Sequence, residues 1–272
     1  MLLVRFMNRA TDSIGQELAF LAHEFREPLA SILFAVDCTS ETPHDEFASR
    51  QMCEMIGRQA RYLARIIDDV LEVNQIKHGK LSLRKELIDV RSVIETAMET
   101  NRPLFTKRRH GLTVSLPRER ILLMADRSRV QQVVNNLLTN AAKYTEPGGR
   151  ISVTVEARGD ELRIEVRDNG IGIAADLLPR VFDLFHQGDG RQHRFSGLGI
   201  GLALVKSLVE LHGGSVTAHS EGKGAGSAFV VLLPGVIRLS RSNNDLAQNP
   251  PAGRRTGECA TAALNGRLQC CF

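Results

Sequence analysis

The sequence predicts an α+β protein in which a long helical hairpin precedes a two-layer α/β sandwich. Three observations predict it: apolar residues recur every three or four positions over residues 13–78, strands and helices are mixed over residues 80–234, and the composition is that of a folded chain. Of the 272 residues, 43% are hydrophobic, 24% are charged and only 5% are aromatic. We therefore expect an aliphatic core, which excludes a disulfide-stapled miniprotein and an aromatic platform for single-stranded nucleic acid.

Residues 13–78 are predicted to form two long helices joined by a short loop. One apolar stripe covers residues 13–37, and the pattern resumes from Phe47 to Ile76 after a break at Pro43. His78-Gly79 is typical of a helix end. A single hairpin cannot cover both of its apolar faces, so we expect a homodimer in which two hairpins form a four-helix bundle.

Residues 80–234 are predicted to form the sandwich. Strands are expected at 81–83, 112–116, 120–124, 151–155, 162–166, 215–220 and 227–233, and helices at 89–104, 127–143 and 199–212. The strands on either side of Gly159-Asp160 alternate strictly, which is typical of a hairpin. Residues 235–272 are rich in Asn, Ser, Gly, Pro and Arg, so we expect a disordered tail or a linker there.

Charge and cysteine content argue against several classes of protein. The net charge is +4, and most of it comes from residues 236–272, which hold five Arg and two acidic residues. The folded part is therefore near neutral, and nucleic-acid binding is not expected. The five Cys include no C-x-x-C pair, which indicates a reducing compartment. No apolar run has the length of a membrane span and no signal peptide is apparent, so a cytoplasmic location is expected.

Two glycine-containing segments carry groups that suit a nucleotide. Asp168-Asn169-Gly170-Ile171-Gly172 follows a strand, where a carboxylate can accept from an exocyclic amine while the backbone approaches a flat base. An ordinary turn is the alternative. Gly197-Leu198-Gly199-Ile200-Gly201 opens a helix, whose N-terminal N–H groups favour phosphate, although a glycine triplet alone is a weak signal.

One predicted helix adds a cluster of polar side chains. Asn136 and Asn140 are four residues apart and so share a helix face, with Lys143 and Tyr144 one turn further on. Amide oxygens and an ammonium group on one face suit a complex of Mg²⁺ with a triphosphate. The alternative is that these are ordinary exposed polar positions.

In this order and spacing, the segments closely resemble the ATP-binding domain of sensor histidine kinases, a branch of the GHKL ATPase superfamily. The resemblance covers residues 80–234 and rests on N-N-L-L-T-N-A-A-K-Y-T at 135–145, D-N-G-I-G at 168–172, F-D-L-F at 182–185, G-L-G-I-G-L-A-L at 197–204 and V-E-L-H-G-G-S-V at 209–216. It implies that Asn136 ligates Mg²⁺, that Asn140 and Lys143 contact the phosphates of ATP, and that Asp168 binds the adenine amine. Residues 186–198 would form a lid over the ATP. The remaining residues of the implied nucleotide site are Tyr144, Gly170, Gly172, Gly197, Gly199 and Gly201.

The first helix carries His23-Glu24-Phe25-Arg26-Glu27-Pro28-Leu29. His23 lies near the edge of the apolar stripe, and Pro28 removes the hydrogen bond to the Glu24 carbonyl. An ordinary helical histidine beside a structural kink would look the same. The segment resembles the phospho-acceptor box H-E-x-R-x-P-L of histidine kinases, including the hybrid branch. This implies that His23 attacks the γ-phosphorus of ATP, that Glu24 takes the Nδ1 proton, and that a response-regulator receiver domain accepts the phosphoryl group.

Two alternatives differ from a histidine kinase in class. An ATP-hydrolysing enzyme of the gyrase or chaperone type would need a Glu general base where this chain has Asn136, and it would have no use for the hairpin. A non-enzymatic scaffold is disfavoured because every nucleotide segment is intact. Glu27 stands where the family often has Thr or Asn, which puts phosphatase activity on the receiver in doubt. The alternative is that Glu27 is a solvent-exposed residue paired with a nearby Arg.

Overall fold

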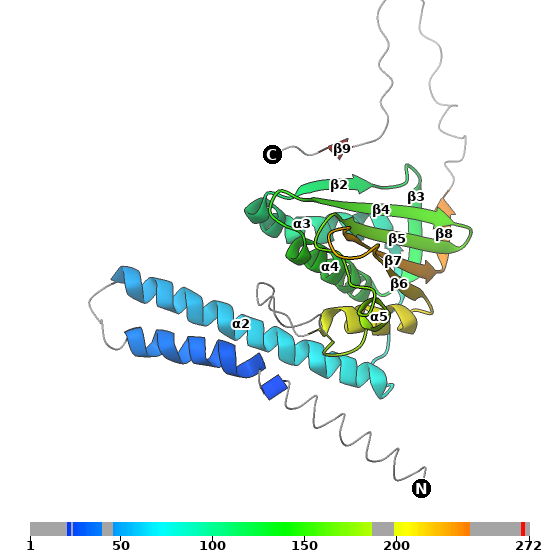
Figure 1. Ribbon diagram of the computed structural model, residues 1–272. Helices are drawn as coiled ribbons and strands as arrows, with labels where there is room; N and C mark the ends of the chain where they lie inside the picture. Colours follow the sequence, from blue (N-terminus) through cyan, green and yellow to red (C-terminus); the bar gives the residue numbers. More distant parts are fainter. Residues whose placement is uncertain (1–20, 23, 40–45, 187–198, 240–267, 270–272) are drawn as a thin grey trace, which may run out of the picture. The chain divides into compact units, whose positions relative to one another are not determined.

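The computed structural model describes residues 21–22, 24–39, 46–186, 199–239 and 268–269 (Figure 1). The chain divides into two compact units. One contains the residues up to Leu81 together with Arg180–Leu204, and the other contains Ser82–Pro179 together with the residues from Val205 onward. In the described residues two helices precede an α/β domain, so the predicted fold class is confirmed. In the described ranges, every helix is too short or too polar to cross a membrane.

The first unit contains two long helices. Residues 21–22 and 24–39 belong to the first, and α2 spans Glu46–Lys77. Pro28 and Ala35 are buried on the first helix, as are Ile66 and Val73 on α2. Many large apolar side chains on these helices are nevertheless exposed: Leu29, Leu33, Phe34, Val36, Phe47, Ile67 and Leu71. The two helices of one copy therefore leave apolar surface in contact with water.

The second unit is built on a six-stranded sheet with the order β6-β7-β5-β4-β2-β9. Its strands are β2 (Gly111–Ser115), β4 (Arg150–Arg158), β5 (Glu161–Asp168), β6 (Ser215–His219), β7 (Ser227–Pro234) and β9 (Leu268–Gln269). β2 and β4 are parallel, and the other neighbouring strands are antiparallel. β4 and β5 form the predicted hairpin, and Gly159 in its turn has a φ of 63°, a conformation that favours glycine.

A second sheet has the order β1-β3-β8, formed by β1 (Glu86–Asp89), β3 (Arg120–Ala125) and β8 (Val236–Leu239). Two predictions are corrected here. Residues 81–83, which were expected to form a strand, lie outside regular structure, and β1 begins at Glu86. Residues 236–239, which were expected in a tail without regular structure, form β8. The N–H groups of Gly235 and Val236 both donate to the Asp160 carbonyl at 2.9 Å, which holds the chain where β8 can pair with β3.

Three helices accompany the sheets: α3 (Val90–Arg108), α4 (Arg127–Tyr144) and α5 (Gly201–Leu211); one turn of 3₁₀ helix covers Leu178–Arg180. Asp89 caps α3 and Asp126 caps α4, each accepting backbone N–H groups of the first turn. Alternate residues of β4 and β5 are buried, and α4 packs against β5 and α3. This core positions α4, the helix that carries the predicted polar cluster.

His212 connects the end of α5 to the start of α4. Its Nδ1 lies 2.8 Å from the Leu208 carbonyl oxygen, and the Asp126 N–H donates to its Nε2 at 3.1 Å. Because Nε2 accepts, the ring is neutral and carries its proton on Nδ1. The side chain is buried, and this burial lowers the pKa of His212.

We expect the free energy of unfolding of the second unit to decrease as the pH falls below about 6.5, the ordinary pKa of histidine. The pKa of His212 is depressed in the folded state, so its stabilising contribution is complete above the unfolded pKa and is lost as the pH falls toward the folded pKa. Burial also lowers the pKa of His110, which contributes separately. His212→Gln keeps an acceptor for the Asp126 N–H but does not titrate. Denaturant unfolding at several pH values should therefore show a weaker acid dependence in this variant, and an unchanged dependence would contradict the assignment.

Candidate functional site

Four half-buried polar residues share one side of α4. They are the residues selected from the sequence: Asn136, Asn140, Lys143 and Tyr144. The opposite side of the helix is apolar and buried, with Leu137, Leu138 and Ala141 in contact with the core. The Lys143 ammonium lies 4.7 Å from the centroid of the Tyr144 ring, a cation–π distance. The helix therefore offers two amide groups and one cation along a surface that is partly shielded from water.

Asp168 is the last residue of β5, and the alternation of that strand turns it toward the core. Its side chain is only 7% exposed. The Gly170 N–H donates to Oδ1 at 2.8 Å, and the Ser227 hydroxyl donates to Oδ2 at 2.5 Å. A carboxylate has about four acceptor positions, so the side chain can accept a further N–H from a ligand.

Ser227 is a site residue that sequence analysis missed. It lies directly opposite Asp168 in the pairing of β5 with β7. The two residues are 59 positions apart in the chain, and only the strand register brings the hydroxyl to the carboxylate. No local motif indicates this contact.

The D-N-G-I-G segment is joined to the end of α4. The Ile171 N–H donates to the Tyr144 carbonyl at 3.0 Å. A Cβ on Gly170 would lie 2.2 Å from that same carbonyl oxygen, which is closer than any side chain tolerates. These contacts place the loop that follows Asp168 beside the last turn of α4, so one cluster contains both groups of predicted residues.

The glycines of this loop are also needed where segments of the protein's own backbone pack closely. Gly172 has a φ of 69°, and a Cβ there would lie 2.0 Å from the Gly222 carbonyl oxygen. The Gly224 N–H donates to the Ile171 carbonyl at 2.6 Å. Gly170 and Gly172 are therefore required by close packing of the protein's own backbone, and no flat ligand is needed to explain them.

The remaining predicted residues fall in other parts of the chain. Gly199 has a φ of 67° and packs against the backbone of His186, and Gly201 is the first residue of α5. His23, Gly197 and the expected lid residues after His186 lie outside the described residues. Glu24 is half-buried on the first helix. Glu27 is exposed, and among the described residues its carboxylate makes no ion pair.

The donor set of this cluster fits a metal ion that is shared with a bound phosphate group. The described residues include no group of three or more His, Cys, Asp or Glu side chains that could hold a metal by themselves. The Asn136 amide supplies one hard oxygen ligand, and Mg²⁺ is commonly held by one or two protein oxygens together with substrate phosphates. The cluster of Asp168 and the polar side chains of α4 therefore suits Mg²⁺ bound together with ATP, and it has too few oxygen ligands to suit Mg²⁺ bound alone.

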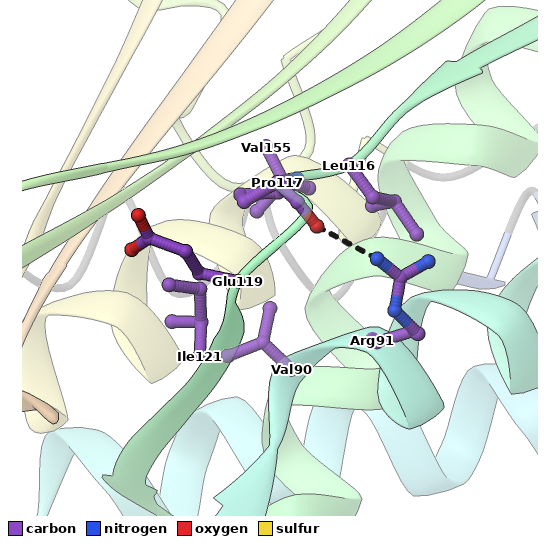
Figure 2. Close-up of a pocket in the computed structure, with 7 residues that line it drawn as sticks. All are labelled: Val90, Arg91, Leu116, Pro117, Glu119, Ile121 and Val155. Carbon is purple, nitrogen blue, oxygen red and sulfur yellow. Dashed lines mark hydrogen bonds between the residues drawn. The ribbon is translucent and has the colours of Figure 1, made fainter. Parts of the chain in front are cut away.

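A small pocket lies elsewhere in the second unit (Figure 2). It is formed by Val90, Arg91, Leu116, Pro117, Glu119, Ile121 and Val155. The Arg91 guanidinium donates to the Pro117 carbonyl at 2.7 Å across it. Its volume of about 10 Å³ is room for one water molecule, and none of the predicted site residues lines it. It is too small for a nucleotide.

Two family models match the chain. Residues 13–79 match the "His Kinase A (phospho-acceptor) domain", and residues 125–237 match the "Histidine kinase-, DNA gyrase B-, and HSP90-like ATPase". Asn136, Asn140, Lys143 and Asp168 lie within the second match. His23 lies within the first.

Similar proteins include sensor kinases and their solved structures. The sensor histidine kinase RcsC of Escherichia coli is 35% identical over 228 residues, which are 83% of this chain and 24% of RcsC. The structure of full-length ShkA in complex with AMPPNP is 28% identical, with a TM-score of 0.60, and covers 81% of this chain and 46% of ShkA. ThkA, solved in complex with the response regulator TrrA, shares the fold at 21% identity, with a TM-score of 0.62 over 84% of this chain and 64% of that one. The chain spans about a quarter of the length of the curated relatives it matches first.

We expect Gly170→Ala to destabilise the second unit by about 1–3 kcal/mol, because the added methyl group meets the Tyr144 carbonyl and forces the backbone to move. Gly111→Ala is the matched control: Gly111 lies at the start of β2, and its nearest atoms would be 3.7 and 3.9 Å from a Cβ. The control should change the stability by less than about 0.5 kcal/mol. Equal unfolding midpoints for the two variants would show that the loop and α4 are not in close contact.

Proposed function

The chain belongs to the sensor histidine kinases, as a catalytic core with a phospho-acceptor domain and an ATPase-type domain, and from this premise we propose that it uses ATP to phosphorylate itself on His23. We further propose that it passes the phosphoryl group to an aspartate of a response-regulator receiver domain. In this proposal residues 13–78 form the dimerisation and phospho-acceptor hairpin, and residues 80–234 form the ATP-binding domain.

The observation that carries the proposal is the contact between α4 and the Asp168 loop. The Ile171–Tyr144 hydrogen bond joins a buried carboxylate to a helix that presents two amides and a cation. A carboxylate acceptor suits the adenine amine, and the amides and the ammonium suit the triphosphate. Groups for both ends of ATP are thus present in one cluster of the second unit.

We assign the residues as follows. Asp168 accepts from the adenine amine, Asn140 and Lys143 bind phosphate oxygens, and the Asn136 amide oxygen holds Mg²⁺. When bound, Mg²⁺ neutralises part of the triphosphate charge.

The transfer itself exchanges one bond for another. The neutral Nε2 of His23 forms a bond to the γ-phosphorus, and the bond from that phosphorus to the bridging oxygen of ADP breaks. ADP leaves with the electron pair. As positive charge develops on the imidazole, Glu24 takes the Nδ1 proton. Phosphohistidine is the product, and it is the donor for the receiver aspartate.

Dimerisation and receiver binding complete the proposal. The seven exposed large apolar side chains on the first helix and α2 would be covered if a second copy completed a four-helix bundle. A structurally similar kinase, ThkA, has been solved with its response regulator TrrA, which supports a receiver domain as the partner.

His23→Gln should abolish incorporation of the γ-phosphoryl group while leaving ATP affinity unchanged within about twofold, since every group assigned to the nucleotide lies in other segments of the chain. The measurement is filter binding with γ-labelled ATP, with ATP affinity measured by calorimetry on the same preparation. Glu146→Gln, which changes an exposed residue after α4, is the control and should retain labelling. Acid-labile label on the His23→Gln chain would mean that another residue is the acceptor. Release of free phosphate without labelling of the wild type would instead indicate an ATP-hydrolysing enzyme.

The site should prefer ATP to GTP by about ten- to a hundredfold. Guanine presents a carbonyl oxygen where adenine presents an amine, so two acceptors would face each other at Asp168, which costs about 1–3 kcal/mol. Competition titrations against a fluorescent ATP analogue measure the ratio. Ser227→Ala provides a second test, because it removes the Oδ2 hydrogen bond and should weaken the preference without touching the phosphate-binding residues. Equal affinities for ATP and GTP in the wild type would overturn the role of Asp168.

A further inference from the structure

Asn101 is a buried amide on α3 that holds α4 through two hydrogen bonds. Its side chain is 7% exposed. The Nδ2 group donates to the Asn135 Oδ1 at 2.9 Å and to the Ala97 carbonyl of its own helix at 2.8 Å. Its Oδ1 accepts from the Thr139 hydroxyl at 3.1 Å. Both donor positions of this amide and one acceptor position are therefore used, which is close to its full capacity.

The two partners on α4 directly precede the two amides of the candidate site. Asn135 comes before Asn136, and Thr139 comes before Asn140. Asn135 and Thr139 are four residues apart and so lie on one face of the helix. Successive residues of an α-helix are about 100° apart around the axis, so fixing this face fixes the direction of the neighbouring face that carries Asn136 and Asn140.

The apolar contacts of α4 do not define its rotation so closely. The seven buried side chains of α4 determine which face meets the core, but apolar contacts are not directional and define the exact rotation less sharply than hydrogen bonds do. A turn of the helix would break the Asn101 hydrogen bonds and leave a buried amide without partners, which is far more costly. The Asn101–Asn135–Thr139 network therefore adds a directional constraint on the rotation of α4 to the constraint set by apolar packing.

We propose that Asn101 is a positioning residue that sets the rotation of α4 and thereby directs Asn136 and Asn140 toward the Mg²⁺-bound triphosphate. This inference rests on the proposed function, because it uses the roles assigned there to Asn136 and Asn140. Asn101 itself touches neither the nucleotide nor the metal. Its influence is thus expected mainly in the Mg²⁺ contact, to a smaller extent in the phosphate contact of Asn140, and not in the adenine contact, since Asp168 lies on β5.

The test measures ATP affinity of the full chain by calorimetry, once with Mg²⁺ and once with a chelator. Asn101→Leu has nearly the same volume but makes no hydrogen bonds. We expect it to reduce the Mg²⁺-dependent gain in ATP affinity roughly tenfold, as loss of a residue that orients metal ligands commonly does. The affinity without Mg²⁺ should fall less, because only the direct Asn140 contact with phosphate oxygens is disturbed there. Autophosphorylation should fall in parallel with the Mg²⁺-dependent gain.

Thr100→Val is the matched control, because it removes a hydrogen bond from the exposed side of the same helix, from the Thr100 hydroxyl to the Thr96 carbonyl, without affecting α4. It should retain the full Mg²⁺-dependent gain. If Asn101→Leu does not fold, Thr139→Val removes a single bond of the network and should reduce the gain about threefold.

Two outcomes would overturn the positioning role: a folded Asn101→Leu chain with the full Mg²⁺-dependent gain, or an equal loss of affinity with and without Mg²⁺, which would indicate a purely structural residue. A wild-type chain that binds ATP equally well in Mg²⁺ and in chelator would overturn the metal assignment of Asn136 in the proposed function, and the role of Asn101 with it.

Discussion

The hydrogen bond from the Ile171 N–H to the Tyr144 carbonyl is the contact on which the candidate site depends. Tyr144 is the last residue of α4, where carbonyl groups have no partner within the helix. The bond satisfies one of these carbonyls and brings the loop after Asp168 against the helix end. This approach is possible only because residue 170 has no side chain. α4 already packs against β5, and this bond fixes how the loop after Asp168 meets the end of the helix.

Polar groups hold α4 at its start, middle and end. At the start, the Asp126 carboxylate caps the first turn while the Asp126 N–H donates to His212. In the middle, Asn135 and Thr139 bond to Asn101, and at the end Ile171 bonds to the Tyr144 carbonyl. The apolar core supplies most of the favourable free energy of burial, but these directional bonds determine where the helix lies. The phosphate-binding role proposed for α4 would need such precision, because misplaced donors stabilise transferred charge poorly.

Sequence analysis identified the elements of the second unit well and the contacts between them poorly. The helix expected at 127–143 was observed at Arg127–Tyr144, because its apolar period and the preceding Asp126 are local signals. β8 was missed, since four residues between a glycine and a polar segment give no periodic pattern and their pairing with β3 depends on a bond to Asp160. Ser227 and Asn101 were missed for the same reason. Each acts on a residue far away in the sequence, so only strand register or helix packing reveals it.

The two glycines after Asp168 show that one sequence motif can have more than one physical cause. Gly170 and Gly172 were selected because a ligand might approach them closely, yet the atoms that exclude a side chain there are the carbonyls of Tyr144 and Gly222. A glycine motif thus indicates a position where a side chain would collide with neighbouring atoms. The sequence alone does not say whether those atoms belong to a ligand or to the protein. At residues 170 and 172 the neighbouring atoms belong to the protein's own backbone. The glycines bring backbone segments together so that Asp168, at 7% exposure, keeps two internal donors and still has acceptor positions for a ligand. The requirement for glycine at these two positions therefore follows from the fold itself, whether or not a ligand also contacts them.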